Sequence, residues 1–252
     1  TAGPVDVLIL EGTTIGQTRG SHGFPDEEDV ERRLCDLLKQ DKNMVFVIAS
    51  GQNIDRAISV HNAALAADRE LVIDPYQAFV LMKLKDICPD APQFDSPSVR
   101  VKFIKYHVEK LKDAGLWGLA CQMSRAGKVT SEQLAANPDR FVYLARSSGA
   151  TAALLNYLAR TTRPTVVWSQ WSGYLKKGGP VQRFCKENGI DPVLIHSGGH
   201  AHPEDLANLV GRIRPRAVVP IHTEAASQFA GLMPNVRVVN DGEAVEIASL
   251  II

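Results

Sequence analysis

Several signatures that identify common enzyme classes are missing from this chain of 252 residues. There is no G-x-G-x-x-G or Walker pattern, which argues against dinucleotide or nucleoside triphosphate binding, and no G-x-S-x-G elbow of a serine hydrolase. No apolar run approaches the roughly twenty residues that a membrane-spanning helix requires. The sequence therefore predicts neither a familiar nucleotide-binding loop nor a membrane protein.

Cysteine is also scarce, and neither sign of charge is in excess. The four cysteines are scattered without a C-x-x-C pair, which favours reduced thiols of a cytoplasmic protein over a disulfide framework or a zinc cluster. Lys plus Arg is 28 and Asp plus Glu is 28, so the chain as a whole carries no electrostatic footprint for nucleic acid or membrane. Any site for a polyanion must be local.

What the sequence does contain is a regular alternation of short apolar runs with amphipathic segments. This pattern predicts an α/β protein whose strands are parallel and joined by helices. Asn53 is predicted to cap a helix, with Arg56 on its surface, and residues 88–101 are predicted to be irregular. The predicted strands are Val5–Leu10, Met44–Ala49, Leu71–Asp74, Phe141–Ala145, Thr165–Trp168, Val193–Ile195, Ala217–Ile221, Val236–Val239 and Val245–Ile252.

The most informative stretch runs from Val193 to Glu224. It predicts a strand, a glycine-containing loop, a helix from Pro203 and a further strand that ends before His222. If the two strands are parallel, the histidines of the loop and His222 lie beyond their carboxyl ends, the edge where open α/β sheets usually bind ligands. Such a pair of histidines suggests phosphoryl or metal chemistry, although loop histidines without a partner would give the same pattern.

This segment resembles the closing motifs of the β-CASP metallohydrolases, a group with the metallo-β-lactamase fold that includes ribonuclease J and the nuclease of pre-mRNA 3′-end processing. Three further segments resemble the same family in the same order along the chain. ILEGTTIG near the start is similar to its motif A element, Ala49–Val60 to the strand and helix that open the inserted β-CASP domain, and Trp168–Leu175 to the return into the parent fold.

The resemblance implies roles for individual residues. Glu11 takes the place of the motif A acid, His200 that of the motif B histidine beside the scissile phosphate, and His222 that of the motif C histidine, a zinc ligand. Glu224 is expected either to orient His222 or to be an acid at a helix start. The residues expected to bind substrate are Ser197, Gly198, Gly199, Ser169 and Ser172, of which the last two could instead form a turn.

Two features depart from the family. Its loop has serine two residues before the histidine, whereas here Gly198 stands there and Ser197 comes one residue earlier. The His-x-His-x-Asp-His cluster and two further ligands precede motif A in the family, and this chain begins ten residues before Glu11. His200 and His202 form an H-x-H pair, but the required Asp-His does not follow, and zinc needs three or four converging ligands.

The resemblance predicts a Rossmann-like β-CASP domain over residues 21–163, inserted in the second half of a metallo-β-lactamase αββα sandwich. Residues 1–20 and 164–252 would form that half. Because it normally packs against a first half that we expect to be missing, an apolar face should be uncovered here. We expect this face to be covered by self-association or by the missing amino-terminal half.

The expected function follows from the same resemblance. The parent protein would be a zinc-dependent phosphodiesterase or nuclease acting on RNA or DNA, with two zinc ions, and this chain alone would hold zinc poorly and be inactive. The first alternative is a non-catalytic β-CASP protein that binds nucleic acid or serves as a scaffold. A third possibility, a Rossmann-like module for a small molecule, would require a closed apolar pocket at the strand ends.

Overall fold

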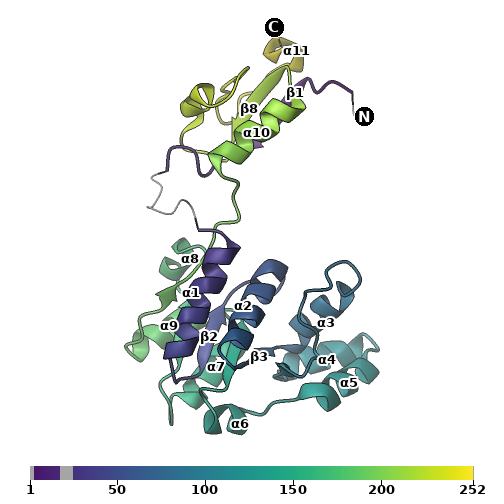
Figure 1. Cartoon of the computed structure of the whole chain (residues 1–252), viewed down its shortest axis with the longest axis vertical. Coiled ribbons are helices and arrows are strands. Elements are labelled where there is room, and N and C mark those ends of the chain that lie inside the picture. The colour runs from purple at the N-terminus through teal and green to yellow at the C-terminus, as the bar shows by residue number, and fades with distance from the viewer. Residues whose placement is uncertain (1–2, 18–24, 252) are drawn as a thin grey trace. The chain divides into compact units, whose positions relative to one another are not determined.

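The computed structural model describes residues 3–17 and 25–251 as a mixed α/β protein (Figure 1). All of its strand pairs are parallel, which confirms the predicted fold class at this level. The described chain divides into two compact units. The smaller unit contains residues 3–17 and 199–251, and the larger contains residues 25–198.

The larger unit is built around a six-stranded sheet with the order β4-β3-β5-β2-β6-β7. Its central strand β2 is completely buried, because helices cover both faces of the sheet. Val45 and Val47 contribute to the core on one face and Phe46 and Ile48 to the core on the other. The strands are β2 Val45–Ile48, β3 Glu70–Ile73, β4 Val99–Val101, β5 Phe141–Ala145, β6 Thr165–Trp168 and β7 Val193–Leu194.

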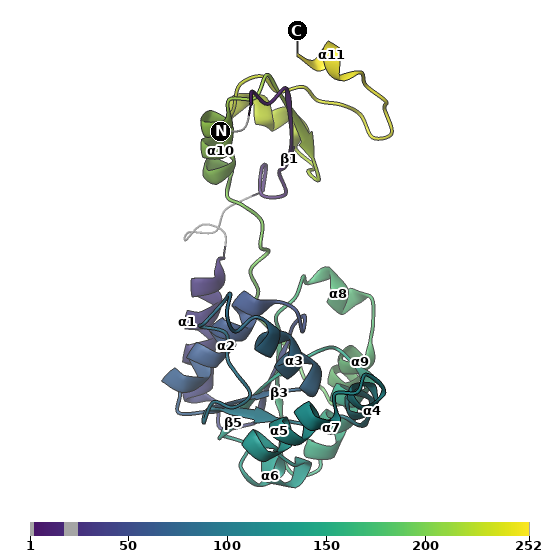
Figure 2. The ribbon, with the colours of Figure 1, turned by 90° about the vertical axis from the view of Figure 1, so that its right-hand side faces the viewer.

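Local capping explains where several helices of this unit begin. The side chains of Asp26, Asn53 and Asp74 accept hydrogen bonds from backbone amides in the first turns of α1, α2 and α3, and the cap predicted at Asn53 is confirmed. Figures 1 and 2 both show α1 beside α2. The helices are α1 Glu27–Gln40, α2 Ile54–Ala66, α3 Pro75–Lys83, α4 Lys105–Asp113, α5 Trp117–Gly127, α6 Ser131–Ala136, α7 Gly149–Leu158, α8 Gly173–Lys176 and α9 Pro180–Glu187.

The smaller unit contains a single parallel pair of strands, β1 (Val7–Glu11) and β8 (Ala217–Ile221), in which Glu11 lies opposite Ile221. Helix α10 (Pro203–Ile213) lies across this pair in Figure 1, and the core between them includes Leu10, Val218, Leu206 and Val210. The predicted helix from Pro203 is therefore confirmed. A 3-10 helix, η1, spans Ala226–Gly231 and a short helix, α11, spans Ile247–Leu250.

One apolar face of this strand pair has no cover within the smaller unit. Ile9 on β1 is 63% exposed and Ile221 on β8 is 47% exposed. A two-stranded parallel sheet is normally buried on both faces, because neither face is polar enough for water. The uncovered face that the sequence predicts is present, while its covering by another chain or by a further copy stays a prediction.

The boundary between the two units differs from the predicted one. The prediction placed residues 164–252 together, but strand β6 pairs with β2 in parallel register, with Val166 opposite Phe46. Val167 and Trp168 are buried in the core of the larger unit, so residues 164–198 complete its sheet and the division falls after Gly198. The other predicted boundary, between Gly20 and Ser21, lies outside the described residues.

The predicted strands near the carboxyl end are wrong. Val236 forms only an isolated parallel bridge with Val218, and the segment predicted as Val245–Ile252 contains helix α11, with Ile252 itself outside the described residues. A β-branched run forms a strand only where a neighbouring strand offers free backbone groups, and β8 offers them to a single residue here. In the segment predicted to be irregular, Val99–Val101 forms β4.

Within residues 3–17 and 25–251, no helix is both long enough and apolar enough to cross a lipid bilayer.

Candidate metal and phosphate site

Three predicted site residues meet in the smaller unit. Glu11 is the last residue of β1, His222 follows β8 directly, and His200 lies in the loop before α10. Because β1 and β8 are parallel, their carboxyl ends lie at the same edge, which places Glu11 beside the start of the His222 loop. One ligand atom from each of the three residues lies within 4.8 Å of the others.

The carboxylate of Glu11 is held in place by backbone amides. The amide of Thr13 donates to Oε2 at 2.9 Å and the amide of Ala201 donates to Oε1 at 3.2 Å, while Nδ1 of His200 lies 3.4 Å from Oε2. Burial alone would raise the pKa of Glu11, but these amides and the nearby His200 outweigh it and lower the pKa below its usual value. Glu11 is therefore a carboxylate at neutral pH.

The ring of His222 is held by the side chain of the same Thr13. The hydroxyl Oγ1 of Thr13 lies 3.0 Å from Nδ1 of His222 and also donates to the carbonyl oxygen of His222 at 3.2 Å. The rings of His200 and His222 lie 5.5 Å apart between centroids and are tilted by 44°. The backbone of His222 is left-handed, with φ of +51°, a conformation that residues other than glycine seldom adopt outside functional loops.

Glu11, His200 and His222 together could hold a metal ion. Nδ1 of His222 is engaged by Thr13 and Nδ1 of His200 faces Glu11, so Nε2 of each ring remains as the nitrogen that can bind a metal. Two imidazoles and one carboxylate make a set used by catalytic zinc, where a water completes the coordination. Among the described residues, Glu11, His200 and His222 are the three potential ligands that converge in this way. Two metal ions would need further ligands.

Ser169 and Ser197, predicted to bind substrate, are engaged by a buried arginine in the larger unit. Arg56 is 0% exposed and donates to the carbonyl oxygen of Ser169, at 2.9 Å, and to the hydroxyls of both serines. Its guanidinium also binds both carboxylate oxygens of Glu27, at 2.7 and 3.0 Å, and the hydroxyl of Ser197 donates to Glu27 at 2.6 Å. The prediction of a surface arginine at position 56 is wrong.

The remaining predicted residues lie at the surface. Gly198 and Ser172 are exposed, and Ser172 makes no side-chain hydrogen bond to the first turn of α8. Gly199 has φ of +67°, a conformation that favours glycine in this turn before His200. Glu224 is exposed, and among the described residues the side chain that holds the ring of His222 is Thr13 rather than Glu224.

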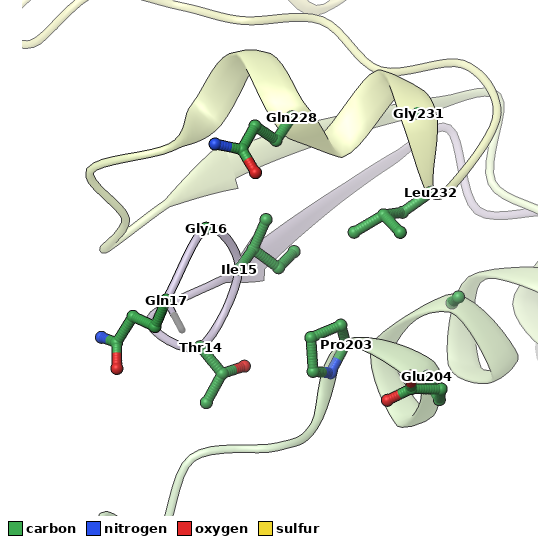
Figure 3. Close-up of a pocket in the computed structure, with 10 residues that line it drawn as sticks. Thr14, Ile15, Gly16, Gln17, Pro203, Glu204, Gln228, Gly231 and Leu232 are labelled. Atoms are coloured by element: carbon green, nitrogen blue, oxygen red, sulfur yellow. The ribbon is translucent and has the colours of Figure 1, made fainter. Parts of the chain in front are cut away.

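A shallow groove of about 520 Å3 lies next to this site within the smaller unit. It is formed by the turn after Glu11, the start of α10 and η1, and Figure 3 shows Ile15 and Leu232 pointing towards each other across it while Pro203 faces them. Gly16 closes one end with φ of +80°, and a Cβ there would lie 2.5 Å from Cβ of Ala225. The turn that carries Thr13 and lines this groove therefore requires glycine at position 16.

Comparison with known proteins supports the fold alone. No protein-family model matches the sequence, and no curated protein matches it significantly. A crystal structure of a protein of unknown function from Enterococcus faecalis V583 is similar, with 16% identity, a TM-score of 0.57 and coverage of 96% of this chain. The alignment covers 51% of that protein, so this chain spans about half of its length.

Sequence reasoning missed the residues that hold the predicted ones in place. Thr13 is near Glu11 in sequence but 209 residues from His222, so no local pattern links it to that ring. Arg56 and Glu27 are 29 residues apart and belong to different helices. An acid in the first turn of one helix and an arginine in the first turn of the next are each explained by ordinary surface positions, so only the packing of α1 against α2 reveals the pair.

Proposed function

We propose that this chain is the carboxyl-terminal part of a zinc-dependent phosphodiesterase of the β-CASP family, acting on RNA or DNA. The observation that carries the proposal is the convergence of Glu11, His200 and His222 at the carboxyl ends of two parallel strands. These three residues occupy the family's motif positions A, B and C in sequence order. The parallel α/β architecture and the similarity to a solved structure support the fold that the proposal requires.

In this proposal each residue has one task. His222 would bind the ion through Nε2, since Thr13 engages Nδ1. Glu11 would orient His200, whose Nδ1 lies 3.4 Å from its carboxylate, so that Nε2 of His200 can donate to a phosphate oxygen when protonated. A bound zinc ion would supply Lewis acidity and a water that loses its proton near neutral pH.

The site in this chain would be incomplete for catalysis. In this proposal His222 is the one metal ligand among the three converging residues, which falls short of the ligands that two metal ions need, and the uncovered face of β1 and β8 lies on the same small unit. We propose that an additional segment of the parent protein supplies the missing ligands and covers the exposed Ile9. The similarity to about half of a longer solved chain is compatible with such a parent.

A non-catalytic role is the second candidate, and the short donor set is the observation that favours it. Such a β-CASP protein would bind nucleic acid or act as a scaffold without turnover. The two candidates differ in the metal site of the parent protein, because an enzyme must complete the donor set and a scaffold need not.

Elemental analysis after dialysis against trace zinc tests both candidates. We expect this chain to retain almost no zinc and a version extended upstream in its gene to hold about two ions per chain, as two-metal sites require. His222→Ala in the extended version should lower the zinc content, and Thr223→Ala should not. An extended version without zinc would favour the scaffold, and zinc-dependent hydrolysis by this short chain that His200→Ala abolishes would contradict its predicted inactivity.

A further inference from the structure

Thr13 contacts two of the three residues of the candidate site. Its amide donates to Glu11 at 2.9 Å, and its hydroxyl lies 3.0 Å from Nδ1 and 3.2 Å from the carbonyl oxygen of His222. Gln17 in turn donates to the carbonyl oxygen of Thr13 at 2.6 Å, which fixes the turn that carries the hydroxyl. The same residue therefore holds the carboxylate and the second imidazole together.

Both contacts of the Thr13 hydroxyl can be hydrogen bonds in one arrangement of the protons. A threonine hydroxyl has a single hydrogen to donate and two lone pairs that accept. The carbonyl oxygen of His222 can only accept, whereas Nδ1 can donate or accept, depending on the tautomer. Both contacts are satisfied together if the hydroxyl donates to the carbonyl oxygen and Nδ1 donates to Oγ1, and neutral His222 then carries its lone pair at Nε2.

The same hydroxyl also supports the backbone of His222. A φ of +51° is unfavourable for a residue with a Cβ, and such conformations persist where surrounding contacts hold them. The bond from Thr13 to the carbonyl oxygen of His222 is one such contact. The ring and the main chain are both bound by Thr13, so the hydroxyl restrains the orientation of the imidazole and favours the Nδ1-protonated tautomer.

We propose that Thr13 is the positioning residue of the metal-binding histidine: it holds His222 as the Nδ1-protonated tautomer and thereby keeps the lone pair of Nε2 available to a metal ion. The part concerning metal rests on the proposed function, whereas the tautomer is a property of the metal-free chain. A histidine with Nδ1 bound by an outer partner is the usual arrangement in zinc sites. Here the partner is a hydroxyl from the turn after Glu11.

Nitrogen-15 NMR of the histidine side chains in the metal-free chain tests the tautomer directly. Spectra are recorded more than one pH unit above the ordinary histidine pKa of about 6.5, and His222→Ala assigns the His222 signals. We expect protonated Nδ1 and unprotonated Nε2 in the wild type and in Thr13→Ser, which keeps the hydroxyl. Thr13→Val, which keeps the shape, should shift His222 towards protonation at Nε2 or to a mixture.

Binding of Co2+ to the version extended upstream in its gene, followed by the visible absorption of the ion, tests the consequence for metal. Thr13→Val should weaken Co2+ binding about tenfold, the lower end of the range for loss of an outer partner, and Thr13→Ser should bind like the wild type. Thr223→Val is the matched control, because among the described residues the hydroxyl of Thr223 accepts from the amide of Ala225 rather than contacting the ring of His222.

The outcomes separate this inference from the proposed function. If the wild type shows His222 protonated at Nε2, or if Thr13→Val leaves the tautomer unchanged, the role of Thr13 is wrong whatever metal is bound. If neither this chain nor its extended version binds metal, while the tautomer depends on the Thr13 hydroxyl, the proposed function fails and the positioning role stands.

Discussion

The two units of this protein differ in how far they bury their apolar sheet faces and their polar side chains. In the larger unit the central strand β2 is covered on both faces, and the fully buried guanidinium of Arg56 is completely paired. In the smaller unit β1 leaves Ile9 63% exposed, and the polar groups of Glu11, His200 and His222 gather at an accessible strand end.

The difference indicates that the polar groups buried around Arg56 in the larger unit contribute to stability, whereas those of the candidate site in the smaller unit are accessible to a ligand. In the larger unit Arg56, Glu27, Ser169 and Ser197 satisfy one another, so this buried group contributes to folding rather than to ligand binding. The smaller unit keeps imidazole nitrogens at an accessible strand end and leaves an apolar face uncovered, and under the proposed function an ion and a further layer of protein would occupy them. The larger unit resembles a complete sheet domain, whereas the smaller resembles part of one.

The largest effect should come from removing the paired charge of the larger unit. Arg56→Met keeps most of the side-chain volume but leaves Glu27, Ser169 and Ser197 without their shared donor, so we expect a loss of about 3 kcal/mol in the free energy of unfolding. Urea denaturation measures this change. Arg32→Met is the matched control, because Arg32 pairs with Asp29 on the exposed surface of α1 and its loss should change stability far less than the loss of Arg56. Equal losses in the two variants would show that Arg56 is no more important than a surface arginine.

A smaller effect should appear on acidification. Burial raises the pKa of Glu27, but hydrogen bonds from Arg56 and Ser197 outweigh it and lower the pKa below the ordinary 4.5. A carboxyl group with a lowered pKa in the folded state stabilises the protein above pH 4.5, and this contribution is lost as the pH falls through the lowered value.

The variant Glu27→Gln should therefore be less stable than the wild type by about 1 kcal/mol at pH 7. The difference should shrink towards zero under acid, because the wild-type carboxyl then becomes neutral as well. Urea denaturation at pH 7, 5 and 3 follows it, and a difference that stays constant with pH would contradict the lowered pKa.

A substitution on the uncovered face of β1 and β8 should cause the smallest change in stability and the clearest change in assembly. Ile9→Lys should alter the free energy of unfolding by less than about 0.5 kcal/mol, because the side chain is already 63% exposed. If a second copy covers this face, sedimentation velocity should show a smaller species for the variant. Ile87→Lys, at a side chain that is 80% exposed in the larger unit, should leave sedimentation unchanged. A monodisperse wild-type monomer would contradict self-association through this face.

Much of the fold could be predicted from local patterns. The bounds of β5, β6 and β8 agree with the sequence prediction, because each is a short apolar run between clear helix or turn signals. The helix that starts at Pro203 was equally clear from its proline, its acidic first turn and its apolar face. Predictions failed where a segment needed a neighbour, as at residues 245–251, which contain the short helix α11 (Ile247–Leu250) rather than a strand.

The sequence by itself determined that the strands are parallel, that helices join them, and that Glu11, His200 and His222 are the residues to examine, because periodicity, caps and motif order are local properties. Only the tertiary structure decided that β6 and β7 complete the larger sheet, that Arg56 is buried against Glu27, and that Thr13 holds the ring of His222. Each of these depends on groups from 26 residues apart, as for Val167 and Val193, to 209 residues apart in the chain. Such contacts exist only once packing has brought the segments together, so no local pattern contains them.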